Sequence, residues 1–321
     1  MSPPKVSVLI PTFNVERFLA ENLDAVLAQD FTDFELVISD NCSTDGTFEL
    51  IQNYAARDSR IRCWQNQTNL GGYANFALCH GAARGKYIKF LCSDDKLLHP
   101  SALRKMVKTL EEHKEVSLVS CASMTIDENS NLLGFRNYFG RSAIWGGRDV
   151  IIRCFEAPAN IIGEPTLIMF RRDACQHRGN PRYRQIGDLE FCFHFLETGR
   201  FAFIAEPLAA WRRRGGQESE VNRLSGEASK DELWLIQEWF SKPWLKECAT
   251  RQMLFTQIRH LRKLYGNEAS ELTSEMMSRL GKGWYAAYAF KRKICRPFRK
   301  ILNQMESRWR VAAARKAAFH N

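Results

Sequence analysis

The 321-residue chain is 45% hydrophobic and is long enough to bury one large core or two small ones. It contains no run of about 18 apolar residues, so no membrane-spanning helix is expected, and its first residues lack the apolar core of a signal peptide. Its ten cysteines show no CxxC pair and no zinc-site spacing. We therefore expect free thiols in a reducing cytoplasm.

The net charge of +10 lies in the C-terminal tail. Residues 282–321 hold eleven Lys and Arg and one acid, so the first 281 residues are close to neutral. The basic balance therefore describes the tail and not the main domain.

Apolar strands alternate with helical segments up to residue 120. The expected strands cover residues 6–10, 34–39, 61–64, 87–91 and 116–120. The expected helices cover residues 18–28, 48–56, 74–83 and 102–113. This order predicts an α/β fold with a mostly parallel sheet, joined by right-handed crossovers and flanked by helices on both faces.

Polar residues follow three of these strands, at 11–14, at Asp40 and at the pair Asp94 and Asp95. Ligands of open α/β sheets bind outside the carboxyl ends of the strands, so we expect these residues to face one crevice. Asp94 and Asp95 could hold Mg²⁺ together with substrate phosphates. Taken alone, the pair could also be an acidic turn before the next helix.

The second half is less regular. A hairpin turn is expected at residues 127–131, a helix begins at or near Asp188, and residues 211–216 form a basic, glycine-containing loop. Further strands are expected at residues 166–170, 201–204 and 208–211. Beyond residue 221 the chain is expected to be helical.

Five segments together resemble glycosyltransferase family 2. They are VSVLIPTFN at 6–14, DNCSTDGT at 40–47, NLG at 69–71, GKYI at 85–88 and SDD at 93–95. The resemblance implies a GT-A fold and an inverting transfer of sugar from a nucleotide-sugar. It covers about residues 5–220 and leaves the remainder unassigned.

The resemblance implies a donor site built from the loops that follow the strands. Its candidate residues are Pro11, Thr12, Asn14, Asp40, Asn69, Asn75, Asp94, Arg212 and Arg214. The turn at 11–14 would offer backbone groups to the base, and Asp40 would accept a hydrogen bond from a uracil or thymine N–H. Asn69 and Asn75 either line the donor site or satisfy loop backbone.

Asp94 and Asp95 resemble the metal-binding acidic motif of the family, which implies a divalent ion, Mg²⁺ or Mn²⁺, at the diphosphate. Many relatives carry another Asp where this chain has Cys92, a poor ligand for a hard cation. The direct ligand therefore stays open between Asp94 and Asp95, with Asp94 favoured. Arg212 and Arg214 either share the phosphate charge or are solvated loop cations.

The catalytic base of the family is an Asp at the start of a helix, and the matching residue here is Asp188. Glu190 is the less favoured base, and His194 is assigned to packing. Glu164 and Thr166 are candidate acceptor contacts. Their alternative role is to set how the chain enters the following strand.

Apolar residues recur at helical spacing between positions 294 and 312, with Arg and Lys on the other faces. Such a helix commonly lies in an anionic membrane interface, and the alternative is docking on the catalytic domain. We expect residues 282–316 to make peripheral contact with the cytoplasmic membrane face. No nucleic-acid motif accompanies the charge, so a nucleic-acid partner is not expected.

These interpretations predict a GT-A glycosyltransferase domain at 1–220 and a helical region at 221–321. Residues 1–122 would bind the nucleotide-sugar, and residues 123–220 would bind the acceptor. The predicted activity is inverting transfer from a UDP- or dTDP-linked sugar to a saccharide or lipid-linked saccharide, serving surface polysaccharide or glycan biosynthesis. Cys92 and Gly187, which replace acids of the family pattern, support one alternative, a catalytically inactive nucleotide-sugar-binding or membrane scaffold.

Overall fold

The computed structural model describes residues 3–157, 159–174, 176–177 and 179–291, which divide into two compact units. The first unit takes its residues from Met1–Gly147, Ile162–Arg182 and Gly187–Gly215. The second takes them from Arg148–Ile161, Tyr183–Ile186 and Gly216–Asn321. The domain boundary predicted at residue 220 thus lies near the last change of unit, but the second unit also contains two earlier stretches.

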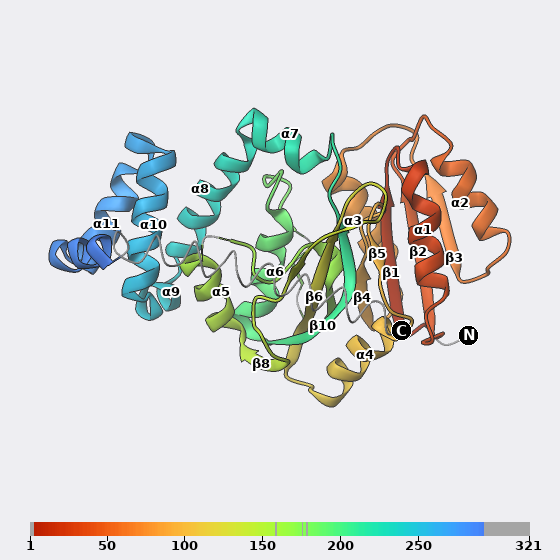
Figure 1. Ribbon diagram of the computed structural model, residues 1–321, viewed down its shortest axis with the longest axis horizontal. Coiled ribbons are helices and arrows are strands. Elements are labelled where there is room, and N and C mark those ends of the chain that lie inside the picture. The colour runs from red at the N-terminus through yellow and green to blue at the C-terminus, as the bar shows by residue number, and fades with distance from the viewer. Residues whose placement is uncertain (1–2, 158, 175, 178, 292–321) are drawn as a thin grey trace. The chain divides into compact units, whose positions relative to one another are not determined.

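Strands and helices alternate through the first part of the first unit. In order they are β1 (Val6–Thr12), α1 (Glu16–Leu27), β2 (Phe34–Asp40), α2 (Thr47–Ala55), β3 (Ile61–Gln65), α3 (Gly72–Ala82) and β4 (Tyr87–Phe90). The strands pair in parallel in the order β3–β2–β1–β4 (Figure 1). Every residue of β2 is buried, as expected for a parallel strand with helices over both faces.

The sheet continues with antiparallel pairings and one parallel pairing, between β6 and β10. The elements are β5 (Lys96–Leu97), α4 (Ala102–Glu112), β6 (Val116–Ile126), β7 (Leu132–Arg136), β8 (Ala143–Gly146), the 3-10 helix η1 (Pro165–Leu167), β9 (Ile168–Arg171), α6 (Gly187–Thr198) and β10 (Arg200–Arg212). The order is β3–β2–β1–β4–β9–β6–β10–β5, and β9 is antiparallel to both of its neighbours. The predicted α/β class is confirmed, and the sheet is mixed beyond its first four strands.

Two segments differ from the expected strands. The strand expected at 166–170 begins only at Ile168, because the chain first makes a turn closed by a 2.8 Å hydrogen bond from the Leu167 N–H to the Glu164 carbonyl. The strands expected at 201–204 and 208–211 form the single strand β10. Its register shifts around Pro207, which lacks the N–H needed to continue the ladder.

Side chains of the first strands alternate between the two faces of the sheet. Val8 and Ile10 join the core formed with α1, α2 and α4 on one face. On the other face, Phe90 stacks on Phe76 of α3 with ring centroids 3.8 Å apart, and Phe191 of α6 meets Phe90 edge-on. Helices thus cover both faces, and the carboxyl ends of β1, β2 and β4 lie at one edge of the sheet.

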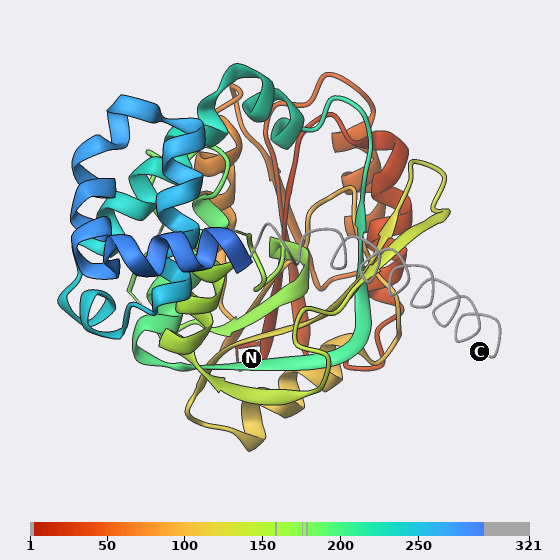
Figure 2. The ribbon, with the colours of Figure 1, turned by 60° about the vertical axis from the view of Figure 1, so that its left-hand side comes forward.

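The second unit is helical and includes nearly all of α5 (Gly147–Glu156). Its other elements are α7 (Glu218–Ser225), α8 (Glu227–Phe240), α9 (Pro243–Cys248), α10 (Arg251–Leu264), the 3-10 helix η2 (Gly266–Ala269) and α11 (Ser270–Leu280). The predicted helical character of this region is confirmed, and α10 and α11 lie side by side (Figure 2).

The helices of the described residues include none that is both long and apolar enough to cross a bilayer. Residues 282–291 form a further helical segment, in which Trp284 and Phe290 are exposed. The rest of the tail, with its apolar repeat between 294 and 312, lies outside the described residues.

Candidate active site

Asp40 ends β2 directly opposite Thr12 of β1, which follows the partly buried Pro11. Its buried carboxylate accepts hydrogen bonds from Thr12 Oγ1 (3.1 Å), Ser43 N (2.9 Å), Ser43 Oγ (2.5 Å) and Gln65 Nε2 (2.9 Å). An ionised carboxylate has about four acceptor positions, so the protein itself fills them. A contact between Asp40 and a ligand would have to replace one of these bonds.

The loops that follow β1 and β2 are tied together at Asn14. This residue has a φ of 46°, in the left-handed region, and its N–H donates to Ser43 Oγ at 2.9 Å. Its side-chain Oδ1 accepts from the Thr44 N–H at 2.8 Å. Asp45 Oδ2 accepts from the Glu16 N–H at 3.3 Å, at the start of α1. The turn at 11–14 is therefore fixed against the loop that follows Asp40.

Asn75 and Asn69 both support the loops at this edge. Asn75 is buried, donates to the Ser39 carbonyl at 2.9 Å and accepts from Asn66 Nδ2 at 3.1 Å. Asn69 Oδ1 accepts from Asn41 Nδ2 at 2.8 Å. Of the two roles that the sequence left open, these contacts correspond to loop support.

Asp95 points into the protein. Its Oδ1 accepts from the backbone N–H of Arg212 at 2.7 Å, and its Oδ2 accepts from the hydroxyl of Thr166. Burial, followed by the neighbouring charge of Asp94, raises the pKa of Asp95 well above its usual range. Asp95 therefore serves as an internal link between the end of β4, η1 and the end of β10.

Asp94 lies at the rim of the same site. Its Oδ2 accepts from Arg214 Nε at 2.8 Å, and its side chain keeps 13% of its surface exposed. Adjacent positions in the sequence thus place one carboxylate inside the protein and leave the other partly exposed. Asp94 is the one that a ligand can reach.

Arg212 and Arg214 also differ in the exposure of their side chains. The side chain of Arg212 is only 1% exposed, pairs with Glu21 of α1, and donates to the carbonyls of Asp94 (2.6 Å) and Asp127 (2.8 Å). Arg214 is 26% exposed. Arg212 is therefore part of the framework, whereas Arg214 is a partly exposed cation beside Asp94.

Cys92 and Lys89 lie beneath the acidic pair. Burial, then the charges of Asp95, Asp94 and Asp188, raise the pKa of the Cys92 thiol well above its usual range, so it is no ligand for a hard cation. Lys89 is fully buried, and its ammonium donates to the carbonyls of Thr166, Phe90 (3.1 Å) and Ile168 (3.4 Å). Burial lowers the pKa of Lys89 to about 8. The eight cysteines of the described segments are free thiols, as expected.

Asp188 is the second residue of α6. The pKa of its carboxyl is raised to about 7, chiefly by burial and to a smaller extent by the nearby Glu164, while the Leu189 N–H opposes the shift by favouring the charged form. Since Asp188 also acts on the Cys92 thiol, it lies within electrostatic reach of the end of β4. The structure thus gathers Asp94, Asp95 and Asp188 around one site.

Glu190, the other acidic residue in the first turn of α6, is hydrogen-bonded to two histidines. Glu190 is buried and bonded to the imidazoles of His177 and His194. The assignment of His194 to packing therefore missed a 2.8 Å hydrogen bond to Glu190.

The two candidate acceptor contacts have different surroundings. Glu164, partly exposed, pairs with Arg136 Nη1 at 2.5 Å and lies near both Asp188 and Asp95. Thr166 is fully buried, and its hydroxyl is bonded to Asp95 and to the Cys92 N–H. Glu164 is thus at the site, while Thr166 shapes it from within.

The donor set at the rim fits a divalent ion that is shared with a diphosphate. Mg²⁺ is usually bound by one or two carboxylates, with water and phosphate oxygens completing its shell. Asp94 supplies such a carboxylate, partly exposed, and Arg214 supplies a neighbouring positive charge. Asp95, with both oxygens already bonded inside the protein, fits this role less well.

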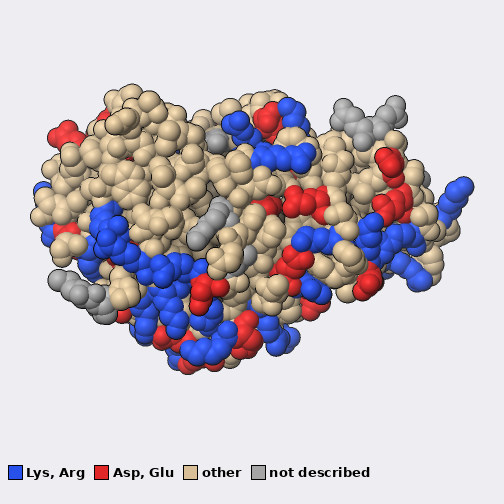
Figure 3. Space-filling view, turned by 180° about the vertical axis from the view of Figure 1, so that it is seen from behind, with Lys and Arg blue, Asp and Glu red and all other residues tan. Residues whose placement is uncertain are grey.

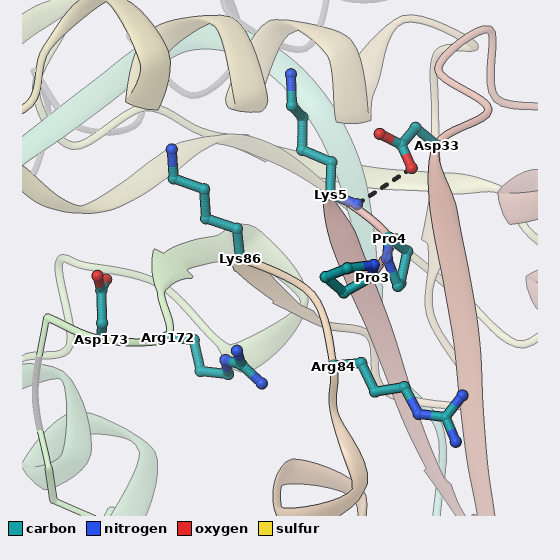
Figure 4. A pocket seen from close by; sticks show the side chains of 8 residues that line it. All are labelled: Pro3, Pro4, Lys5, Asp33, Arg84, Lys86, Arg172 and Asp173. Atoms are coloured by element: carbon teal, nitrogen blue, oxygen red, sulfur yellow. Dashed lines mark hydrogen bonds between the residues drawn. The ribbon is translucent and has the colours of Figure 1, made fainter. Parts of the chain in front are cut away.

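A pocket of about 320 Å³ lies at the opposite edge of the sheet, where β1 and β4 begin. Lys5, Arg84, Lys86 and Arg172 line it together with Asp33 (Figure 4). Lys and Arg side chains also gather on the lower part of the face seen from behind (Figure 3). This basic pocket is separate from the carboxylate site, which lies where the parallel strands end.

The family model described as Glycosyl transferase family 2 matches residues 7–179, more than half of the chain. The chain belongs to glycosyltransferase family 2. The match contains Asp40, Asp94 and Asp95 and stops before Asp188.

Curated relatives match shorter stretches of this family 2 chain. EpsE of Bacillus subtilis is 40% identical over 128 residues, which cover 40% of this chain and 46% of EpsE. A Campylobacter jejuni protein named GalNAc(5)-diNAcBac-PP-undecaprenol beta-1,3-glucosyltransferase is 35% identical over 116 residues, covering 35% of this chain and 37% of that protein. The chain thus spans less than half of the length of these relatives.

Solved structures support the predicted GT-A fold. TarS of S. aureus matches with a TM-score of 0.64 at 21% identity, over 83% of this chain and 45% of TarS. The mannosyltransferase PcManGT of Pyrobaculum calidifontis matches with a TM-score of 0.54 at 16% identity, over 100% of this chain and 89% of that one. At these identities the likeness establishes the fold alone.

Three contributors to the site were missed from the sequence. Arg136 of β7 pairs with Glu164 and lies 4.7 Å from the ring centroid of Trp211. Glu21 of α1 holds Arg212. Lys89 could have been noticed, because a lysine inside an apolar strand needs a special environment.

Proposed function

We propose that this chain is an inverting glycosyltransferase. It moves a sugar from a nucleotide-sugar, UDP- or dTDP-linked, to a saccharide or lipid-linked saccharide in surface polysaccharide or glycan biosynthesis. Membership of family 2 supports the reaction class. The printed names of two relatives support the substrate classes, since TarS was solved with UDP-GlcNAc and the Campylobacter relative is named for an undecaprenol-linked acceptor.

The observation that carries the proposal is Asp188, a carboxyl with a pKa of about 7 that lies near Glu164 and, like Asp94, within electrostatic reach of Cys92. A general base works best when its pKa is close to the operating pH. In the proposed step Asp188 takes the proton of the acceptor hydroxyl while that oxygen attacks the anomeric carbon. The bond between the sugar and the diphosphate breaks on the opposite face, which inverts the anomeric configuration.

Asp94 and Arg214 are the proposed contacts for the diphosphate. Arg214 can turn from Asp94 to phosphate oxygens, since guanidinium binds both groups in the same planar geometry. A divalent ion, Mg²⁺ or Mn²⁺, bound at Asp94 would neutralise charge on the departing nucleoside diphosphate. Glu164, beside Asp188, faces the region proposed for the acceptor, while Asp40 and Asn14 would present the loop backbone to the base.

The C-terminal segment is the proposed membrane contact. The helix at 282–291 exposes Trp284 and Phe290, and the basic apolar repeat follows it in the sequence. This pattern supports a peripheral contact of residues 282–316 with the cytoplasmic membrane face. The proposed catalytic domain is 1–220, and the proposed helical region is 221–321.

The test begins with a hydrolysis screen of UDP-, dTDP- and GDP-linked sugars by the full-length protein, followed by a screen of acceptors. Asp188→Asn should lower kcat by at least about 1,000-fold while leaving the Kd for the donor within about threefold. The pH profile of kcat/KM should lose activity below an apparent pKa near 7. Asp173→Asn, at an exposed acid of the opposite edge, is the matched control and should behave as the parent protein.

Near-full activity of Asp188→Asn would refute the base assignment. Absence of both nucleotide binding and transfer in the parent protein would instead favour a scaffold function.

A further inference from the structure

A second group of side chains that can bind a metal lies outside the carboxylate site. Two of its three members are on α6, the helix that also carries Asp188. Glu190 and His194 are four residues apart on α6, and therefore share one face of the helix. His177 comes from the segment that follows β9. Ligand atoms of all three residues lie within 4.8 Å of one another.

Each of the two imidazoles approaches the Glu190 carboxylate with its own Nε2 atom. His177 Nε2 lies 3.0 Å from Glu190 Oε1, and His194 Nε2 lies 2.8 Å from the same oxygen. The rings stack with their centroids 3.7 Å apart and their planes 25° apart. Both nitrogens thus face one small volume beside the carboxylate.

The Glu190 carboxylate is buried and so depends on its neighbours for compensation of its charge. The Glu190 side chain is 1% exposed, and the two imidazoles are 23% and 22% exposed. A buried carboxylate needs a positive partner. A divalent ion bound by the carboxylate and both ring nitrogens would supply that positive charge.

We propose that His177, Glu190 and His194 bind Zn²⁺, with a water in the fourth position. Two histidines and one glutamate are an established zinc ligand set, and ligand atoms around a tetrahedral zinc ion lie about 3.3 Å apart. The nitrogen–oxygen distances of 2.8 and 3.0 Å are close to that value, so small side-chain rotations would open the site. The Asp94 site, in contrast, offers carboxylate oxygen to a hard cation.

This zinc would hold the segment after β9 against the first turns of α6, two residues beyond Asp188. Its role would be to position the helix, without touching the reacting atoms. The inference does not depend on the proposed transfer reaction, because the ligand set is defined by its own geometry.

The experiment measures metal binding by the full-length protein after chelation and desalting. Zn²⁺ titration by calorimetry should give one tight site per chain, and Co²⁺ should give the intense visible bands of tetrahedral coordination. His194→Gln and His177→Gln should each weaken Zn²⁺ binding at least tenfold and abolish the Co²⁺ bands, because an amide can still donate to Glu190 but is a poor zinc ligand.

Two variants are matched controls. His260→Gln removes a histidine that also pairs with a single glutamate, at 2.8 Å from Glu232, but lacks a second imidazole in the pair. Asp94→Asn removes the proposed hard-cation ligand. Both should keep the tight Zn²⁺ site and the Co²⁺ spectrum.

Three outcomes would overturn the proposal. They are no tight Zn²⁺ binding by the parent protein, unchanged binding after both histidine substitutions, and loss of binding in Asp94→Asn alone. If the histidine variants fail to fold, NMR of the parent protein tests the site instead. Adding Zn²⁺ should shift the imidazole resonances of His177 and His194, and shifts confined to other histidines would refute the site.

Discussion

The backbone N–H of Arg212 donates a 2.7 Å hydrogen bond to Oδ1 of Asp95, although 117 positions separate the two residues in the sequence. Through this bond the end of β10 is fixed to the end of β4. The hydroxyl of Thr166 holds the other oxygen of the same carboxylate. One buried side chain therefore joins three segments directly beneath the proposed diphosphate contact, Asp94.

Asp95→Ala should destabilise the first unit strongly. It leaves the Arg212 N–H and the Thr166 hydroxyl buried without their acceptor, at a cost of about 2–5 kcal/mol in unfolding free energy. Asp95→Asn should cost about 1 kcal/mol or less, since an amide oxygen can accept from Arg212 and the hydroxyl can accept from the amide. Thermal unfolding of the two variants measures the difference. Equal losses would show that Asp95 does not act through these two bonds.

Asp188→Asn should stabilise the protein at pH 8 while removing activity. The pKa of Asp188 is raised to about 7 in the folded state, so the stability contributed by its neutral form is fully present below about pH 4 and is lost as the pH rises through 7. Asn stays neutral and avoids that loss, worth on the order of 1–3 kcal/mol for a partly buried group. Unfolding midpoints at pH 4 and pH 8 check this, with the gain expected only at pH 8. A gain of equal size at both pH values would contradict the assignment.

Arg212 and Arg214 should respond differently to alanine. Arg212→Ala leaves two partly buried backbone carbonyls without their donor, while Glu21 keeps its ion pair with Lys96, and should cost about 2–5 kcal/mol of stability. Arg214→Ala should cost less than about 1 kcal/mol but weaken UDP binding about tenfold. Thermal unfolding and calorimetry with UDP separate the two effects. Normal UDP binding by Arg214→Ala would remove this residue from the donor site.

Asp94 should be the carboxylate on which metal-dependent binding depends. Chelation should lower activity, and Mn²⁺ should restore it. In Asp94→Asn the increase in UDP affinity caused by Mn²⁺ should disappear, and kcat should fall at least about 100-fold. Cys92→Ser is the matched control and should retain the Mn²⁺ effect, since its buried thiol is not expected to be a ligand. Retention of the effect in Asp94→Asn would move the ligand assignment to Asp95.

The sequence predicted the strand ends well because they depend on local signals. Apolar runs closed by polar residues located Asp40 and Asp94, and parallel pairing brought these two strand ends to one edge. The start of α6 was recognised from an acidic residue before an apolar run. These features need only neighbouring residues and the geometry of parallel strands.

Side-chain direction was not predictable in the same way. Asp94 and Asp95 differ in burial because Thr166 and Arg212, both distant in sequence, take up one of them. The sequence predicts packing for His194 but not its hydrogen bond to Glu190 or its stacking on His177, which comes from a different segment. Arg212 and Arg214 could be separated only once Glu21 of α1 was seen to hold the first. Each case depends on contacts between residues far apart in the chain.

The buried ammonium of Lys89 provides positive charge near the carboxylate site from within the protein. Its ammonium is enclosed by backbone carbonyls, including that of Thr166, and lies within electrostatic reach of Asp95. Dissolved salt screens exposed charges, but it has little access to a fully buried ion. Changes in ionic strength and chelation should therefore affect the partly exposed Asp94 and Arg214 and leave the charge balance at the buried Lys89 intact.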